Sequence, residues 1–88
     1  MYAVLVAVSI ENEEEAREQL LNQVVPGVKQ IPGVVSGVWL SPQNGQGYST
    51  VVFETEEQAK AASETVRDRV PPGVTVNHVS VQEVTAHF

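Results

Sequence analysis

The stretch Val34-Val35-Ser36-Gly37-Val38-Trp39-Leu40-Ser41, followed by Pro42-Gln43-Asn44-Gly45, decides the fold, because it predicts a strand that enters a tight turn. Asn44-Gly45 suits the positive φ angles that hairpin turns require. Residues 47–54 are again rich in β-branched and aromatic side chains, as is typical of strands. The whole segment therefore predicts a β-hairpin.

A helix start follows this hairpin directly. Thr55-Glu56-Glu57-Gln58 has the spacing of a capping box, in which the Thr55 hydroxyl and the Gln58 side chain each bond a backbone N–H of the first turn. Pro71-Pro72-Gly73 ends the helix, because proline cannot continue it. One face of this predicted helix carries Ala59, Ala62, Val66 and Val70.

The last predicted strand, from Val74 to about Ala86, is long for a single element. Its valines also change side partway along the strand. Val74, Val76 and Val84 share one parity, while Val79 and Val81 share the other. A β-bulge that resets the pleat would explain this change, and we expect one there.

Residues 2–10 predict a first strand that is apolar on both faces. One parity carries Tyr2, Val4, Val6 and Val8, and the other carries Ala3, Leu5 and Ala7. We expect the small residues of the alanine parity to face a helix and the valine parity to face another sheet.

A helix after this strand begins at Asn12, whose side chain can accept from a free backbone N–H, and Glu13-Glu14-Glu15 suits the positive end of the helix dipole. Its apolar stripe consists of Ala16, Leu20, Val24, Val28 and Ile31. Pro26-Gly27 predicts a kink or break near Val25. Pro32-Gly33 then ends the element.

The element order βαββαβ predicts an α+β fold: a ferredoxin-like plait over residues 1–88, with a four-stranded antiparallel sheet and two helices on one face. The 18 valines lie on both parities of the strands, so we expect an apolar open face. Covering it would contribute on the order of 10 kcal/mol before association costs. A homodimer with its sheets packed face to face is therefore predicted.

Composition argues against several classes of partner. The 88 residues carry five Lys and Arg against eleven Asp and Glu, a net charge of −6, which disfavours binding to nucleic acid or to an anionic membrane. The apolar start, residues 1–10, has no basic residue before it and is too short to span a bilayer, so we predict neither a signal peptide nor a membrane span. Together with the absence of cysteine, this predicts a cytoplasmic protein.

Three segments of the sequence resemble the dimeric α/β-barrel proteins of the antibiotic-biosynthesis-monooxygenase type. They are Pro32-Gly33-Val34-Val35-Ser36-Gly37-Val38-Trp39-Leu40, then Gly45 to Gly47, and Ser49-Thr50-Val51-Val52-Phe53-Glu54-Thr55-Glu56-Glu57-Gln58-Ala59. The resemblance implies a homodimer with a barrel-like interior and a ligand cavity between each sheet and its own helices. Members include cofactor-independent monooxygenases that act on phenolic polyketides, and haem-degrading enzymes.

The residues of the haem-degrading members do not carry over to this chain. Those members have an Asn at the end of the first strand and an axial His on the second helix. Here the strand ends Val8-Ser9-Ile10, and the predicted helix from Glu56 to Val70 has no His. We therefore predict no haem and no other cofactor.

Three residues are candidates for a functional site. Trp39 and Tyr48 could bind an aromatic ligand, as in the Asn, Trp, Arg and Tyr cluster of the polyketide monooxygenases, and Gly37 leaves space beside Trp39. His78 lies mid-strand on a face that is otherwise apolar and could act as a catalytic base near neutral pH. The alternatives are packing roles for Trp39 and Tyr48, and for His78 a hydrogen bond to Asn77, a neighbouring strand or water.

Two functions stay open on the sequence alone. The first is a monooxygenase-like enzyme, or a degenerate relative, that binds a small apolar or aromatic molecule. The second is a non-catalytic dimeric module for ligand binding or assembly. A cavity beside Trp39 would favour the first, and a filled core would favour the second. His78 and His87 have no acidic residue at metal-ligand spacing, so no metal site is predicted.

Overall fold

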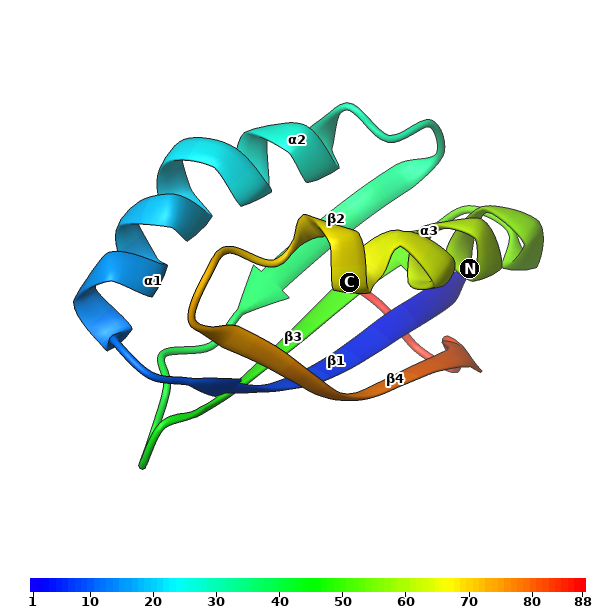
Figure 1. Cartoon of the computed structure of the whole chain (residues 1–88). Coiled ribbons are helices and arrows are strands. Elements are labelled where there is room, and N and C mark those ends of the chain that lie inside the picture. The colour runs from blue at the N-terminus through cyan, green and yellow to red at the C-terminus, as the bar shows by residue number, and fades with distance from the viewer.

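Four strands form one antiparallel sheet in the computed structural model, which describes residues 1–88 (Figure 1). The strands are β1 (Tyr2–Ile10), β2 (Val34–Trp39), β3 (Gln46–Phe53) and β4 (Val74–Glu83), and they lie in the order β2-β3-β1-β4. Asn44, at φ 53°, and Gly45, at φ 75°, make the turn between β2 and β3 as predicted. The predicted α+β class is confirmed, and the architecture is compatible with a ferredoxin-like plait.

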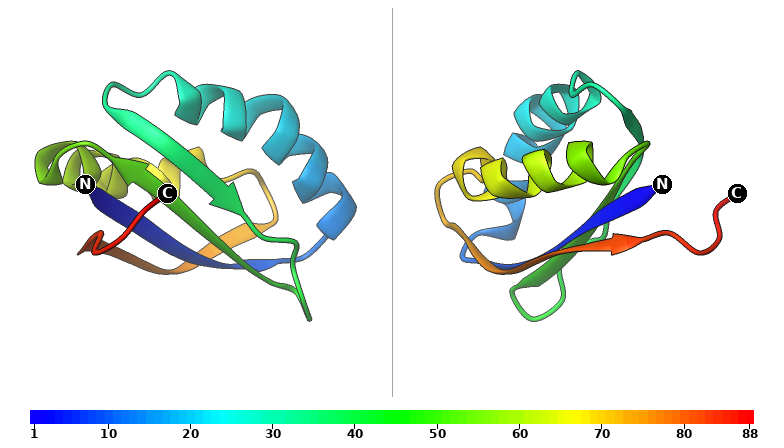
Figure 2. Two further views of the ribbon diagram at one scale, coloured as in Figure 1. Left: turned by 180° about the vertical axis from the view of Figure 1, so that it is seen from behind. Right: turned by 90° about the vertical axis from the view of Figure 1, so that its right-hand side faces the viewer.

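Both helical segments lie on the same face of the sheet (Figure 2). The first runs continuously through α1 (Glu13–Gln19), a π-helical turn η1 (Leu20–Val24) and α2 (Val25–Lys29). The second is α3 (Glu56–Arg69). Asn12 caps the first helix, accepting from the Glu15 N–H at 3.1 Å, and the Thr55–Gln58 capping box begins the second, so both predicted starts are confirmed.

Pro26 disturbs the first helix at the predicted place but does not break it. The π-helical turn comes immediately before the proline, and the Val25 N–H bonds the Leu20 carbonyl five residues back. Pro26 lies in the first turn of α2, directly after the π-helical turn, so the wider turn precedes the residue that lacks an N–H. The irregularity takes the form of a wider, π-helical turn, which interrupts the α-helical pattern at the place where a kink or break was predicted.

Two irregularities in strand pairing set which side chains face the helices. In β4 the register shifts so that Val76 pairs with Val8 and His78 with Ala7, which leaves Asn77 as the extra residue. The predicted bulge is therefore confirmed. A second shift lies between Val34 and Ser36 in β2. Because of the β4 bulge, Val74 and Val76 before it and Val79 and Val81 after it all point to the helix side. Val84 lies past the end of β4.

The face predicted for each parity of β1 is wrong. Val4 belongs to the core with Phe53 and with Ala59 of α3, and Tyr2 and Val6 pack against that core, so the valine parity faces the helices. The alanine parity lies on the open face. Close helix approach comes instead from the small residue Ala59, which is fully buried on α3.

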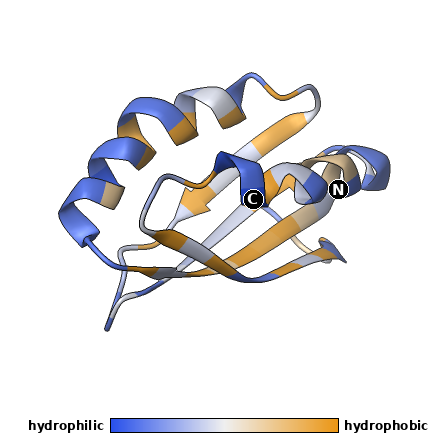
Figure 3. Cartoon of the chain, in the orientation of Figure 1, coloured by the Kyte–Doolittle hydropathy of each residue, from blue (hydrophilic) through white to orange (hydrophobic).

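The expectation of a valine-rich open face is also wrong. By register, its valines are Val38 on β2 and Val52 on β3, and Val52 is buried. The remaining open-face positions are mostly small or polar, namely Ala3, Leu5, Ala7, Ser9, Ser36, Gln46, Tyr48, Thr50, Thr75, His78, Ser80 and Gln82. The pairing registers place most strand valines on the helix side. Figure 3 shows that much of the sheet consists of apolar residues, whereas the helices are largely hydrophilic.

The two helices cover the sheet unequally. Helix α3 packs on β1, β3 and β4, whereas the first helix stands off from the strands (Figure 1). Only eight of the 88 residues are buried, so many apolar side chains on this face are only partly covered. The space under the first helix is where a site can form. No helix of the chain is long and apolar enough to cross a bilayer.

Candidate functional site

A cavity of about 330 Å³ lies between the helices and the sheet. Strands β1 and β3 form its floor, because their pairing register directs valines toward the helices. The apolar stripe of the first helix forms its roof, because apolar residues about four positions apart lie on one helix face. Of its 26 lining residues, 19 are hydrophobic, which gives an interior suited to an apolar molecule. The lining includes Val4, Val6, Val8, Ile10, Ala16, Leu20, Val24, Val28, Val51 and Val66.

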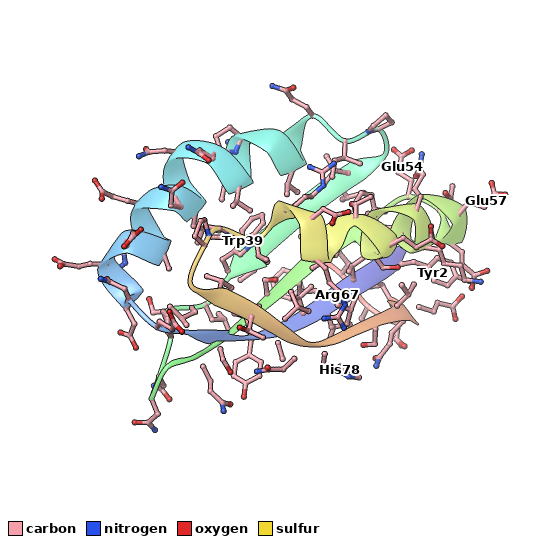
Figure 4. The ribbon with its side chains drawn as sticks, viewed as in Figure 1. Tyr2, Trp39, Glu54, Glu57, Arg67 and His78 are labelled. Carbon is pink, nitrogen blue, oxygen red and sulfur yellow. The ribbon has the colours of Figure 1, made fainter.

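Trp39 forms part of the cavity wall, as Figure 4 shows between the first helix and the sheet. Its ring lies along β2 over Gly37, where a Cβ would come within 2.8 Å of the indole. The room that the missing side chain of Gly37 leaves is thus occupied by the indole ring itself. The indole N–H makes no hydrogen bond to protein, so it is available to a ligand.

Tyr48 borders the same cavity, but it is 54% exposed. It pairs with Ala7, so its side chain points to the open face, and its hydroxyl lies 3.4 Å from the Gln46 side-chain oxygen. Trp39 and Tyr48 are therefore neighbours at this end of the hairpin, with side chains on opposite faces of the sheet.

His78 lies outside the cavity. It pairs with Ala7 on the open face and is exposed, and Figure 4 shows it beyond β4, away from Trp39. Asn77, the partner considered for it, instead donates to the Ser9 hydroxyl at 2.7 Å. The structure thus does not bring His78 together with Trp39, and a catalytic role for His78 stays a prediction.

The charged groups that line the cavity are both arginines, Arg17 on α1 and Arg69 at the end of α3. Neither forms an ion pair, since the one salt bridge of the chain joins Lys60 to Glu56. The Arg69 Nε donates to the Thr65 hydroxyl at 3.2 Å, and one of its terminal nitrogens lies against Gly27 of α2. A positive group therefore lies between the two helices, above an apolar interior.

Arg67, two residues before Arg69, has a structural role instead. Its guanidinium donates to the Val76 carbonyl at 3.0 Å, next to the bulge residue of β4. The contact fastens the end of α3 to the irregular part of that strand.

A second hollow adjoins the cavity on its α3 side and is more polar than the cavity. The two share Val24, Arg69, Val70 and Pro71, but two of the nine residues lining the second are hydrophobic. Its polar residues are Gln19, Gln23, Asp68 and Arg69. We call this second hollow the polar groove. The apolar cavity and the polar groove meet at Arg69.

Outside this site, the pKa of Tyr2 is raised, first by the negative charge of Glu83 and then by that of Glu56. The Tyr2 hydroxyl lies 3.4 Å from a Glu83 carboxylate oxygen, and the group is exposed on β1. The chain has no group of three His, Asp or Glu residues that could hold a metal ion.

The sequence did not single out the arginines as site residues. Arg17 follows Ala16 in the apolar stripe, which was the available signal that it borders the interior. Arg69 gave no such signal, because its position depends on how the end of α3 meets the first helix.

No protein-family profile matches the chain, and no curated protein matches it either.

Proposed function

We propose that the protein binds a small apolar or aromatic molecule in the cavity beneath its first helix. The observation that carries this proposal is the 330 Å³ apolar cavity with Trp39 in its wall. Sites for small molecules typically begin at roughly 300 Å³ and are mostly apolar with a few polar groups. The indole N–H and the two arginines are such polar groups.

The energetics of the fold favour an occupied cavity. The valines that line it are mostly only half-buried, because the first helix stands off from the sheet. A ligand that displaces water from these side chains would gain about 25 cal/mol for each Å² of apolar surface that it covers. It would also stabilise the folded state, since it binds that state alone.

The wider proposal is a relative of the antibiotic-biosynthesis-monooxygenase type. A cavity between the sheet and its own helices supports it, because the resemblance implies a cavity in that place. The enzyme-like function would require that the bound molecule react with oxygen, and the candidate base, His78, lies on the other face of the sheet. Ligand binding without catalysis is therefore the part of the proposal that the geometry supports best.

The proposal includes a homodimer built through the open face of the sheet, which would form a dimeric α/β barrel. Exposed apolar residues on and beside that face support it: Val38 is 55% exposed, Leu40 59% and Tyr48 54%. A standard interface buries roughly 800 Å² on each partner. That is about a seventh of the 5919 Å² surface of the chain.

Trp39 is the single tryptophan of the chain, so its fluorescence reports on the cavity without background. We expect octan-1-ol and other small apolar compounds to change Trp39 emission saturably and to raise the melting temperature. At 100 times the dissociation constant the added stability is about 2.7 kcal/mol. No saturable change with any member of a broad apolar and aromatic panel would contradict the proposal.

Oxygen uptake separates the enzyme from the binding module. We expect ligands to bind, and we expect Trp39→Ala to weaken binding because it removes the cavity wall. If phenolic or quinol substrates are consumed with oxygen, and His78→Ala lowers the rate, the enzyme-like function is supported. Binding without oxygen uptake supports the non-catalytic module.

A further inference from the structure

We infer that the ligand of this site is an amphiphilic anion, whose apolar body occupies the cavity and whose carboxylate lies in the polar groove against Arg69. The inference rests on the proposed function, because it names the class of molecule that the cavity takes. It starts from the contact between two hollows of opposite character, which share Val24, Arg69, Val70 and Pro71.

The division of polarity is the first reason for an amphiphile. The cavity is lined mainly by aliphatic side chains and has no acidic residue in its lining. The polar groove offers the side chains of Gln19, Gln23 and Arg69 as hydrogen-bond donors. A molecule that is apolar throughout would leave those donors bonded to water. A molecule with a polar head group would accept hydrogen bonds from them while its apolar body fills the cavity.

The charge and attachment of Arg69 are the reasons for an anion. Its Nε is held by the Thr65 hydroxyl, which orients the guanidinium and leaves the terminal nitrogens to donate. A terminal nitrogen of Arg69 lies beside Gly27 of α2, 3.9 Å from where a Cβ would be, so the guanidinium reaches the first helix. A guanidinium pairs well with a planar carboxylate.

Two other charged residues bear on the position of the carboxylate. Asp68 also lines the polar groove, so it repels an anion and favours a position on the Arg69 side. Arg17 lines the cavity but not the polar groove. Arg17 is therefore the alternative anchor, and it would place the head away from Gln19 and Gln23.

The test compares octanoate, octan-1-ol and octylamine, which share an apolar chain and differ in the head. Binding is measured by Trp39 emission and by calorimetry. We expect the folded protein to bind octanoate about tenfold more tightly than octan-1-ol, as one charge-assisted hydrogen bond allows. Octylamine should bind more weakly than octan-1-ol, because the positive charge of Arg69 repels its ammonium group.

Single substitutions show which residue binds the carboxylate of octanoate. Arg69→Gln should abolish the preference for octanoate over octan-1-ol, and Arg69→Lys should restore part of that preference. Lys29→Gln removes the same charge from α2 outside both hollows, so it should keep the preference. Circular dichroism checks that each variant is folded.

The outcomes separate this inference from the proposed function. If octanoate and octan-1-ol bind the wild type equally, the inference is wrong while the apolar site stands. If Arg17→Gln removes the preference and Arg69→Gln does not, the carboxylate binds at Arg17 rather than at Arg69, and the inference is overturned. If none of the three compounds binds, the proposed function itself fails.

Discussion

Gly33 joins the first helix to β2 at a backbone φ of 83°, a conformation that other residues rarely adopt. A Cβ there would also collide with the side chain of Gln58, which belongs to the capping box of α3. The Gly33 carbonyl in addition accepts from the Glu54 N–H at 2.9 Å. One residue without a side chain therefore lets the end of one helical segment meet the start of the other.

We predict that Gly33→Ala lowers the free energy of unfolding by about 1–3 kcal/mol, because it combines an unfavourable φ with a collision. Gly27→Ala is the matched control: Gly27 lies in a helix, and its nearest contact would be an ordinary 3.9 Å. There alanine should stabilise by roughly 0.5–1 kcal/mol, because it favours helix. Urea unfolding followed by circular dichroism measures both, and equal effects would contradict this account.

At the scale of elements, the capping box fixes where α3 begins. The Gln58 N–H donates to the Thr55 hydroxyl at 3.2 Å, and the Thr55 N–H donates to the Gln58 side chain at 3.2 Å. These bonds satisfy backbone groups that the helix itself leaves without partners. Because Ala59 packs against Val4 and Phe53 in the next turn, the cap also sets the position of the core.

We predict that Thr55→Ala destabilises the protein by about 1 kcal/mol, the usual effect of losing such a cap. Thr55→Ser keeps the hydroxyl and is expected to stay within about half of that loss. Thermal unfolding of the three proteins tests this directly. A Thr55→Ser variant as unstable as Thr55→Ala would show that the hydroxyl is not what matters.

Elements were predictable from the sequence where their signals are local. Neighbouring residues predict the caps at Asn12 and Thr55, the turn at Asn44-Gly45, and the order of helices and strands along the chain. The structure agrees with these predictions. The faces of the strands were not predictable in the same way. A bulge moves every later side chain to the other side, so the register across strands, which is a long-range property, decides which valines face the helices.

The candidate site, too, could be predicted from the sequence only where its signals are local. Trp39 lines the cavity, and the sequence had indicated this residue, beside Gly37 on β2, as a candidate for binding a ligand. His78 follows the bulge, so its face depended on a register that a single strand does not reveal. Arg69 gains its place from the meeting of α3 with α2, which is also beyond local sequence signals.

At the scale of the whole molecule, the 88-residue chain has few fully buried side chains, and the two faces of its sheet have separate roles in our proposals. The helix-side surface lines the cavity, and the open face of the sheet would bind a second copy. Because the bulges remove valines from the open face, the dimer depends on fewer apolar residues than the sequence indicated. The cytoplasmic location stays a prediction.

The dimer has a direct test in sedimentation. We predict a particle of about twice the 9.5 kDa chain mass in analytical ultracentrifugation. Val38→Glu should dissociate it, because it places a charge on the exposed part of the open face. Ala61→Glu adds the same charge to the exposed side of α3 and should leave the dimer intact. A wild-type mass of one chain at all concentrations would contradict the proposal.

The central claim is that the cavity under the first helix holds a small apolar molecule, and the valine methyl groups of the chain test it most directly. In a nuclear magnetic resonance titration with octan-1-ol, we predict saturable shifts at Val6, Val24 and Val66, which line the cavity. Val38 and Val52, on the open face, should keep their positions. The absence of saturable shifts at the three cavity valines, or shifts confined to Val38 and Val52, would contradict the claim.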